Sequence, residues 1–469
     1  MSDANLIQFT VDPEAQIPLF QQIYEELRQR IVSGSLKSQK RLPSSRAFAQ
    51  ELGVSRSSVV TAYDQLIAEG YAESRQGSGV YVSELPDLMV SAESPVSTAS
   101  SRETVLNDHE VRPFYPGMPD MRLFPYDKWS RCVARVARDY PREIITVQSR
   151  FGDIRLREAI ASHLAEWRGL SVSPDQIIIT AGALGGMELA LRVMSRQAPD
   201  LYLENPGYKA MKSLAISSGI KPKWLDVDHH GARLPDDIKN NGSGLIILTP
   251  SHQYPLGGTM PTARRTGFLN YASETESWIL EDDFDSEFRY SGKPIQSLAG
   301  MDREGRVFYA GSFSKIFSVG LRLGYLVVPE QTIGLFSGEL SRYSKVASVA
   351  PQRALAVFME NGEFHKHIRR MRRIYGLRRK LFVSHMDRLS ELVSYNDFGA
   401  GMQVAVYFNH KTDDVEVSRT LKKAGIDCPP LSHFYSENSK SGLLMGYCSF
   451  DESEIERWML RFGEVIKKA

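Results

Sequence analysis

The pattern of apolar and polar positions near the start of the chain predicts a helix. The apolar residues that recur there at helical spacing are Leu19, Phe20, Ile23, Leu27 and Ile31. Gly34 follows as a C-terminal stop, because glycine readily adopts the left-handed conformation in which many helices end.

Two shorter helices and a pair of strands are expected next. The first helix opens at Ser44 and ends near Gly53, and the second is capped by Ser55, whose hydroxyl can accept the free amides of a first turn. Short strands are expected at residues 71–75 and 80–83, around a glycine-rich turn. Helix, helix, turn, helix and hairpin is the order of a winged helix-turn-helix.

From residue 111 onward, short apolar runs alternate with helical stretches. The runs lie at residues 177–180, 201–203, 245–248, 278–280, 307–309 and 325–328. This alternation predicts a mainly parallel sheet with helices on both faces. From about Met359 the chain becomes helical and basic and then carries scattered strands such as 403–408, so we expect a smaller C-terminal α+β subdomain.

The stretch between these two patterns, residues 84–110, is rich in Ser, Pro, Glu and Asp and lacks periodicity. Such a composition predicts a flexible linker. The chain of 469 residues is therefore expected to be multidomain, with a mostly helical winged unit at residues 14–83 and an α/β unit at residues 111–469.

Composition narrows the class of protein. The chain is 42% hydrophobic and 24% charged, which is ordinary for a globular protein, and no apolar run is long enough to span a bilayer. The start of the chain lacks a signal-peptide pattern, and three widely spaced cysteines predict no disulfide framework, so a cytoplasmic location is expected. A net charge of +1 excludes a uniformly basic nucleic-acid coat.

Positive charge is nevertheless concentrated in one part of the N-terminal region. Residues 37–58 contain five basic side chains and one acidic one, whereas residues 1–85 as a whole contain eight basic and ten acidic ones. A helix N-terminus offers free amides to phosphate, and arginine offers a forked donor. Ser55, Arg56 and Ser57 lie in the first turn of the third predicted helix, where they suit contacts in the major groove.

Several short motifs follow one another through this region. They are Arg41-Leu42-Pro43-Ser44-Ser45-Arg46, Leu52-Gly53-Val54-Ser55-Arg56, Ala62-Tyr63-Asp64-Gln65-Leu66, Glu69-Gly70-Tyr71 and Gly77-Ser78-Gly79. Together they resemble the GntR-type winged helix-turn-helix over nearly all of residues 18–82. The resemblance implies that double-stranded operator DNA is contacted by Arg41, Ser44, Arg46, Ser55, Arg56, Ser57 and Gly77.

A carboxylate, a lysine and an arginine follow predicted strands of the α/β region. Asp282 ends one strand, Lys315 follows the next strand, and Arg322 comes seven residues later. Ligands bind at this edge of a parallel sheet, where a lysine can form a Schiff base and a carboxylate can hold a pyridinium nitrogen protonated, as pyridoxal phosphate (PLP) requires. An arginine and the free amides of a helix that opens near Gly182 can hold a phosphate.

In this order, these elements resemble the fold-type-I aminotransferase domain over most of residues 114–469, and the whole chain resembles a MocR/GabR-type transcription regulator. The resemblance implies that Lys315 forms the internal aldimine of PLP and that Asp282 pairs with the pyridine nitrogen. It also matches residues 249–257 to the family's active-site loop. The further cofactor contacts that it implies are Arg322 and Ser312 at the phosphate, Gly182, Ala183 and Leu184 in the phosphate cradle, Tyr208 beside the ring, and Ser314 and Tyr254.

The chain departs from that resemblance where relatives contact the cofactor ring and the substrate. Phe284 stands where a tyrosine is expected and has no hydroxyl for the cofactor's phenolic oxygen, and we hypothesise that Tyr254 supplies one from the other side. Residues 443–447 lack the arginine that grips a substrate carboxylate in aminotransferases. Ala210 and Gln403 replace charged or histidine side chains of some relatives.

Loss of a bidentate carboxylate clamp removes the positioning that turnover of an α-amino acid uses. We therefore expect a PLP-dependent, DNA-binding transcription regulator with little or no turnover, whose effector is PLP itself or an amine or amino acid that forms an aldimine. The alternatives are an active aminotransferase with a fused DNA-binding domain, and a DNA-binding protein whose large domain only dimerises. The resemblance also implies a homodimer, and no pattern of metal ligands is present.

A basic run at residues 365–373 permits two interpretations. The favoured one is a solvated helix face, with Ile368, Met371 and Tyr375 turned toward the core. The alternative is a second DNA-contacting surface on the large domain.

Overall fold

The structure is a computed structural model that describes residues 10–15, 17–84, 112–234, 243–291, 295–343 and 347–468. The chain divides into two units, Met1–Asn107 and Asp108–Ala469. Apart from residue 84, the predicted linker at 84–110 lies outside the described residues. None of the described helices is long and apolar enough to cross a membrane.

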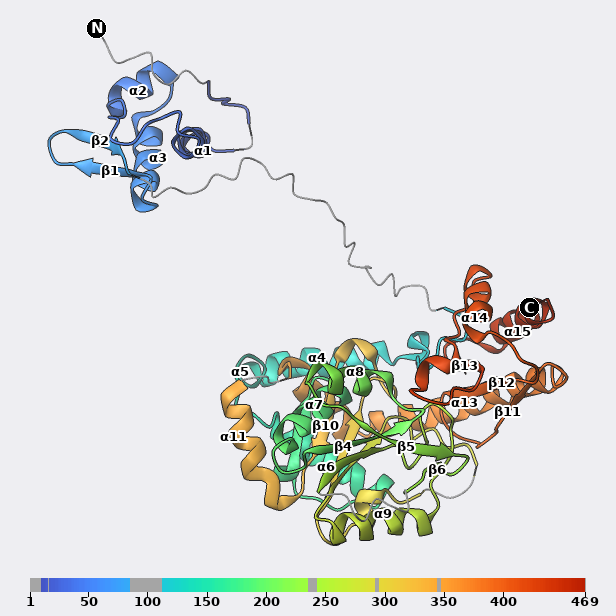
Figure 1. The fold of residues 1–469 in the computed structure, drawn as a ribbon. Coiled ribbons are helices and arrows are strands. Elements are labelled where there is room, and N and C mark those ends of the chain that lie inside the picture. The colour runs from blue at the N-terminus through green and yellow to red at the C-terminus, as the bar shows by residue number, and fades with distance from the viewer. Residues whose placement is uncertain are drawn as a thin grey trace. The chain divides into compact units, whose positions relative to one another are not determined.

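The N-terminal unit has the predicted winged helix-turn-helix fold (Figure 1). Its elements are α1 (Leu19–Val32), α2 (Ser45–Leu52), α3 (Arg56–Ala68), β1 (Ala72–Arg75) and β2 (Gly79–Val82). Strands β1 and β2 pair as an antiparallel hairpin, whose tip projects away from the helices in Figure 1. One apolar core, which includes Ile23, Phe48 and Leu66, joins the helices to the hairpin.

Short-range hydrogen bonds define the ends of α2 and α3. The Ser44 hydroxyl accepts from the Ala47 amide at 3.2 Å, and the Ser55 hydroxyl accepts from the Ser58 amide at 3.2 Å. Gly53 ends α2 in the left-handed region, with φ 66°. These boundaries depend on neighbouring residues alone, which is why they could be predicted from the sequence.

The larger unit is built on an eight-stranded sheet in the order β3-β10-β9-β8-β7-β4-β5-β6. Its strands are β3 (Ile177–Thr180), β4 (Asp200–Asn205), β5 (Lys223–Asp228), β6 (Gly231–Ala232), β7 (Gly244–Leu248), β8 (Trp278–Asp283), β9 (Val307–Ser312) and β10 (Gly324–Val327). Neighbours from β9 to β5 pair in parallel, which confirms the predicted mainly parallel sheet, whereas β10 and β6 run antiparallel to their partners. Strand β10 turns back because residues 313–323 are too few for the helical crossover that a parallel partner needs.

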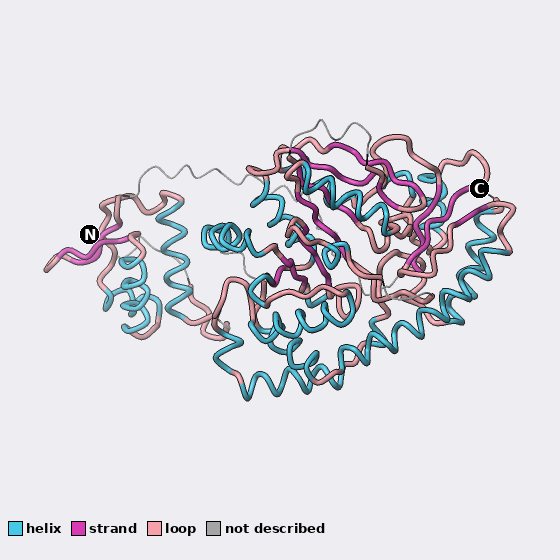
Figure 2. The backbone as a smooth tube through the Cα atoms, turned by 90° about the horizontal axis from the view of Figure 1, so that it is seen from below, coloured by secondary structure: helices cyan, strands magenta, loops and turns pink. Residues whose placement is uncertain are grey.

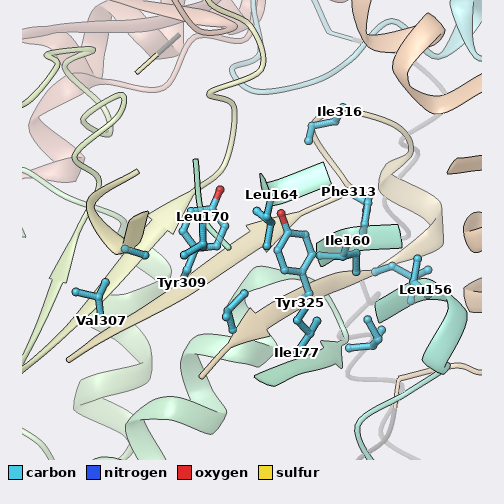
Figure 3. Close-up of a cluster of buried hydrophobic side chains, with 14 of the residues drawn as sticks. Leu156, Ile160, Leu164, Leu170, Ile177, Val307, Tyr309, Phe313, Ile316 and Tyr325 are labelled. Carbon is cyan, nitrogen blue, oxygen red and sulfur yellow. The ribbon is translucent and has the colours of Figure 1, made fainter. Parts of the chain in front are cut away.

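Helices cover both faces of this sheet, as Figure 2 shows in cyan around the magenta strands. They are α4 (Tyr126–Asp139), α5 (Pro141–Ile145), α6 (Ile154–Arg168), α7 (Ala183–Met194), α8 (Lys209–Ser217), α9 (Thr262–Glu274), α10 (Leu298–Met301), α11 (Ile333–Tyr343) and α12 (Ala350–Glu360). Successive residues of a strand point to opposite faces of the sheet. On one face Tyr325 packs with Ile160 and Leu164 of α6 (Figure 3), and on the other Leu326 packs with Met187 of α7.

A smaller α+β subdomain completes the chain. Its elements are α13 (Glu363–Asp387), β11 (Val393–Tyr395), β12 (Gln403–Phe408), α14 (Asp414–Lys423), β13 (Gly442–Gly446) and α15 (Glu452–Ile466). The basic run lies on α13, where Ile368, Met371 and Tyr375 are buried, as the interpretation as a solvated helix face expects. The second DNA-contacting surface stays a prediction.

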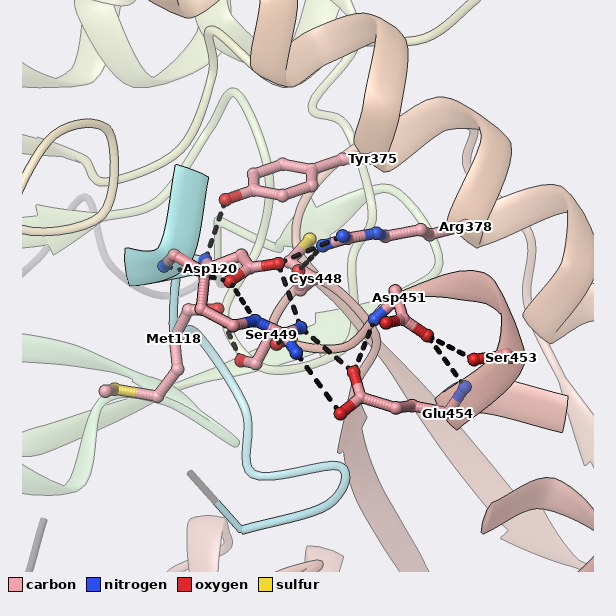
Figure 4. Close-up of polar contacts among 10 residues, drawn as sticks. Met118, Asp120, Tyr375, Arg378, Cys448, Ser449, Asp451, Ser453 and Glu454 are labelled. Atoms are coloured by element: carbon pink, nitrogen blue, oxygen red, sulfur yellow. Dashed lines mark hydrogen bonds and ion pairs between the residues drawn. The ribbon is translucent and has the colours of Figure 1, made fainter. Parts of the chain in front are cut away.

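A buried ion-pair network fastens the start of the larger unit to this subdomain (Figure 4). Asp120 pairs with Arg378 of α13 at 2.9 Å, and both side chains are buried. Arg122 joins Asp120 to Glu454 of α15, with 2.9 Å to each carboxylate. The network holds in place the segment that carries Gly117, whose carbonyl oxygen reaches the predicted site.

We expect Arg378→Met to lower the free energy of unfolding of the larger unit by about 1.5–3 kcal/mol, because a buried charge-assisted hydrogen bond to Asp120 is lost while Arg122 still pairs with that carboxylate. Arg461→Met is the matched control, since Arg461 and Glu464 are both exposed and such pairs contribute about 1 kcal/mol or less. Urea unfolding followed by tryptophan fluorescence measures both. Equal losses in the two variants would contradict the assignment.

Candidate functional site

The site is organised around three consecutive carboxylates at the end of β8. Side chains alternate along a strand, so Glu281 and Asp283 share one side and Asp282 points to the other. Arg168 at the end of α6 neutralises the first side, with its Nε 2.7 Å from an Asp283 oxygen and its guanidinium 4.0 Å from Glu281. Two amides at the start of α10 also donate to Glu281.

Asp282 has no such compensation. The residue is 7% exposed, and its Oδ1 has no hydrogen-bond partner among the residues that the structure describes. Burial raises the pKa of this carboxyl well above its ordinary value, and the charges of Asp283 and Glu204 act in the same direction. A buried acceptor in this state suits a ligand that brings a positively charged N–H, as a pyridinium does.

Lys315 lies in the loop between β9 and β10, where the charge of Asp282 acts on it. Its Nζ donates to the carbonyl oxygen of Gly117 at 2.8 Å. Burial lowers the pKa of this amine, while the charges of Asp285 and Asp282 oppose the shift. A lowered pKa enlarges the neutral fraction of the amine, which is the form that attacks a carbonyl carbon.

The antiparallel return of β10 gathers the groups predicted to hold phosphate. Gly324 pairs with Ser312 on one side and with Thr180 on the other, so the ends of β9 and β3 meet there. Gly182 follows with φ 80° and leads into α7, whose first amides are free. A side chain at Gly324 would clash with this turn, because an added Cβ would lie 2.5 Å from the Gly182 carbonyl carbon.

The predicted phosphate ligands meet at this point. The Ser314 amide donates to the Ser312 hydroxyl at 3.2 Å. Arg322 leaves the short loop helix with φ 46°, and its exposed side chain lines the same hollow as Thr180 and Leu184. Small residues, free amides and an arginine therefore surround one place, beside Ala183 at the start of α7.

A cluster of aromatic rings lies beside Asp282, since Tyr208 and Phe434 line the same pocket as this residue. The ring of Tyr254 meets those of Tyr208, Phe284 and Phe434 edge to face, with centroids 5.8, 5.5 and 5.6 Å apart. Burial raises the pKa of Tyr208, and the charge of Asp282 acts in the same direction. Phe284 and Tyr254 are thus neighbours, which is necessary if the Tyr254 hydroxyl is to replace the hydroxyl that Phe284 lacks.

His252 and Asp285 received no role from the sequence, although His252 lies in the matched loop at residues 249–257. The structure pairs them: His252 Nδ1 lies 2.9 Å from Asp285 Oδ1, and the two residues are 5% and 1% exposed. Gly401 leaves room for the imidazole, since an added Cβ there would lie 2.0 Å from the ring. Asp285 is the strongest charge acting on Lys315, so this pair belongs to the site. The sequence signals for this pair were limited to a histidine within residues 249–257 and an acidic residue just after β8.

Residues 443–447 lie away from solvent in and beside β13, and none of them is an arginine. Gln403 of β12 does lie at the site, because its Oε1 would be 3.4 Å from a Cβ at Gly117, next to Lys315. Its Nε2 has no hydrogen-bond partner within the described part of the chain. The group that Gln403 brings next to Lys315 is thus a neutral amide, where some relatives have a charged or histidine side chain.

The predicted DNA contacts form a second, separate group on the N-terminal unit. The seven residues, all exposed, are Arg41, Ser44, Arg46, Ser55, Arg56, Ser57 and Gly77. In the described ranges none of their three arginines has an ion-pair partner, whereas Arg30 is paired with Glu26 and Arg75 with Glu73. The Ser44 and Ser55 hydroxyls cap helices, and their contact with DNA stays a prediction.

Comparison with known proteins matches both parts of the chain. Residues 19–82 match the family described as "Bacterial regulatory proteins, gntR family", and residues 124–460 match "Aminotransferase class I and II". The chain is 35% identical to the probable rhizopine catabolism regulatory protein MocR of Rhizobium meliloti, over 94% of this chain and 92% of that protein. It is 33% identical to the HTH-type pyridoxine biosynthesis transcriptional regulator PdxR of Corynebacterium glutamicum, over 97% of each.

Solved aminotransferases share the fold of the larger unit. An archaeal alanine:glyoxylate aminotransferase superposes with a TM-score of 0.71 at 24% identity, over 78% of this chain and 94% of that one. LysN, the α-aminoadipate aminotransferase of Thermus thermophilus complexed with N-(5'-phosphopyridoxyl)-L-leucine, gives 0.69 at 22% identity, over 79% and 95%. The fold is thus that of fold-type-I aminotransferases, as predicted.

We expect Arg56→Gln to weaken binding to a double-stranded DNA fragment about tenfold and to reduce the slope of log K against log salt by about 1, because one phosphate contact is lost. Arg30→Gln, at an arginine already paired with Glu26, is the control and should change neither. Fluorescence anisotropy at several salt concentrations measures both quantities. An unchanged slope in Arg56→Gln would remove this side chain from the interface.

We expect Tyr254→Phe to raise the midpoint of the pH-dependent absorbance change of the PLP-loaded protein by about one unit, because a donor to the phenolic oxygen is lost. Adding Phe284→Tyr in the same chain should restore the midpoint, since the two rings are neighbours. A midpoint that stays the same in Tyr254→Phe would sink the hypothesis that this hydroxyl replaces the missing one.

Proposed function

This chain belongs to the MocR-type transcription regulators, which join a GntR-type DNA-binding domain to an aminotransferase class I and II domain, and from that premise we propose that it senses PLP or a small amine through Lys315. In the proposal, ligand state in the larger unit changes how the winged unit binds operator DNA. The observation that carries it is the buried Oδ1 of Asp282, which has no hydrogen-bond partner in the described part of the chain, in a carboxyl on which Lys315 acts electrostatically.

The residues present fit pyridoxal phosphate. Asp282 would receive the pyridine N–H, Lys315 would hold the aldehyde carbon covalently, and Arg322 with the first amides of α7 would hold the phosphate. When bound, PLP supplies an aldehyde carbon at which the amine of Lys315 can be exchanged for that of a small molecule. Burial keeps water away from Asp282 and enlarges the neutral fraction of Lys315.

The same pocket favours a sensor over an efficient aminotransferase. Neither residues 443–447 nor Ala210 provides an arginine, and Gln403 offers only an amide. An α-amino acid would therefore enter without the forked clamp that fixes its carboxylate during turnover. An effector that needs no such clamp, PLP itself or a simple amine, fits these residues better.

A homodimer completes the proposal. Fold-type-I relatives build their sites between two subunits, and a pair of winged units suits two half-sites one or more DNA turns apart. In such a dimer, a ligand that binds more tightly to the DNA-free form than to the DNA-bound form would weaken DNA binding by the same factor. A ligand with the opposite preference would strengthen DNA binding.

The test uses the PLP-loaded full chain and an operator fragment selected by binding from a random DNA pool. A panel of amines and amino acids is screened for changes in cofactor absorbance and in operator affinity together. We expect Lys315→Ala to lose the cofactor's visible band and the response to ligand while it retains basal DNA binding, because the winged unit has its own core.

Lys423→Ala, at an exposed lysine of α14, is the matched control and should behave as the unchanged chain does. A Lys315→Ala protein that still responds to the same ligand would overturn the proposal. Catalytic, rather than stoichiometric, conversion of an amine donor by the unchanged chain would favour the active aminotransferase.

A further inference from the structure

A cavity that Lys315 does not line lies beside the His252–Asp285 pair. Its volume is about 260 Å³, and both members of the pair contribute to its lining. An apolar cavity of about 150 Å³ holds benzene, so this one is large enough for a molecule the size of a small amino acid. Nothing in the proposed function uses this space.

Glu287 presents an unsatisfied acceptor to the cavity. The residue is 6% exposed, and its Oε1 faces His163 Nε2 at 3.4 Å, but its Oε2 has no partner among the described residues. His163 in turn contacts His365 at 3.1 Å, so the imidazole is engaged on both nitrogens. A buried carboxylate oxygen left in this way costs free energy unless a donor or a cation reaches it.

Unsatisfied donors line the same cavity. Arg289 Nε and Trp167 Nε1 are buried without hydrogen-bond partners in the described part of the chain. Burial lowers the pKa of Arg289. Arg372 lies 5.1 Å from the centre of the Trp167 ring and donates to the backbone oxygen of Glu287. An anionic group would satisfy these donors.

Two other charged residues of the lining are already paired. Arg168 is held by Asp283, and Asp285 is held by His252. What remains is the buried carboxylate of Glu287, the exposed carboxylate of Glu166 and two guanidiniums, and among the described residues the buried unsatisfied atoms include both an acceptor and donors. A purely cationic or purely anionic ligand would leave one set unmet, whereas a molecule that carries an ammonium and a carboxylate meets both.

We propose that this cavity binds a small zwitterion, with its ammonium on Glu287 and its carboxylate on Arg289, Arg372 and Trp167. The site is separate from the Lys315 pocket and does not depend on covalent chemistry there. Asp285 borders the cavity and acts electrostatically on Lys315. A charged occupant would therefore change the electrostatic environment of the Lys315 amine.

The test uses zwitterions that have no primary amine and so cannot react with PLP: the N,N-dimethyl derivatives of glycine, β-alanine and γ-aminobutyrate. Isothermal titration calorimetry with the PLP-loaded full chain should show that at least one binds with a Kd of about 1 mM or tighter. Dimethylamine and acetate, which each carry one charge, should bind at least about tenfold more weakly.

Glu287→Gln and Arg289→Gln should each weaken the binding of that probe about tenfold, since each removes one charge-assisted hydrogen bond. Glu274→Gln and Arg303→Gln, at exposed residues, are the matched controls and should leave it unchanged. Arg289 is partly exposed, so its variant serves even where Glu287→Gln does not fold.

No heat from any of the three probes, or equal affinity in both lining variants and the controls, overturns the proposal and means that the cavity holds only water. Neither result touches the proposed function, because the response at Lys315 is measured with primary amines and through cofactor absorbance. Loss of that response with intact binding of the dimethyl probes would, conversely, leave only the second site standing.

Discussion

The row of three buried carboxylates at the end of β8 is the constraint on which the rest of the larger unit depends. Charges removed from water must be paired, or their pKa shifts until they are neutral. Strand alternation allows Arg168 to serve Glu281 and Asp283 from one side, but it places Asp282 where that arginine has no access. The protein therefore carries a buried acceptor, Asp282 Oδ1, that has no partner among the residues that the structure describes.

The short return from β9 to β10 is the second element that shapes the pocket. It is too short to hold a crossover helix, so β10 runs backward between β9 and β3 and brings the ends of these two strands together. Lys315 and Arg322 both lie in this return, while Gly182 follows β3. One topological choice thus places an amine, an arginine and a helix N-terminus around the same space.

What could be predicted from the sequence follows the range of the interactions. The winged unit was predictable nearly element by element, because Ser44, Gly53 and Ser55 act on residues three or four positions away. The strands were predictable from their apolar runs, and the site residues that resemblance implied gather at one sheet edge. The direction of β10 was not predictable from its apolar run, since direction depends on loop length and on which neighbours the strand finds.

The contacts that escaped prediction join distant parts of the chain. His252 and Asp285 form an ion pair although they lie in separate motifs. The cavity beside this pair forms where Trp167, Glu287 and Arg372 come together from three different parts of the chain. No local pattern marks such a meeting, because each of these residues alone is ordinary for its element. Only the packed structure shows that Glu287 retains an oxygen without a partner among the described residues.

The energetics of these two carboxylates suggest how a regulator of this design can work. A ligand shifts an equilibrium only by the difference in its affinity for two states, so a sensor needs groups whose free energy changes greatly when a ligand arrives. Asp282 and Glu287 are such groups, because each is buried and has one carboxylate oxygen without a partner among the described residues, and such an oxygen gains more from a partner than an exposed one does. The winged unit, by contrast, has its own core, so its fold needs no signal. Regulation is therefore expected to act on how the winged units are presented to DNA, with the free energy supplied by the carboxylates of the larger unit.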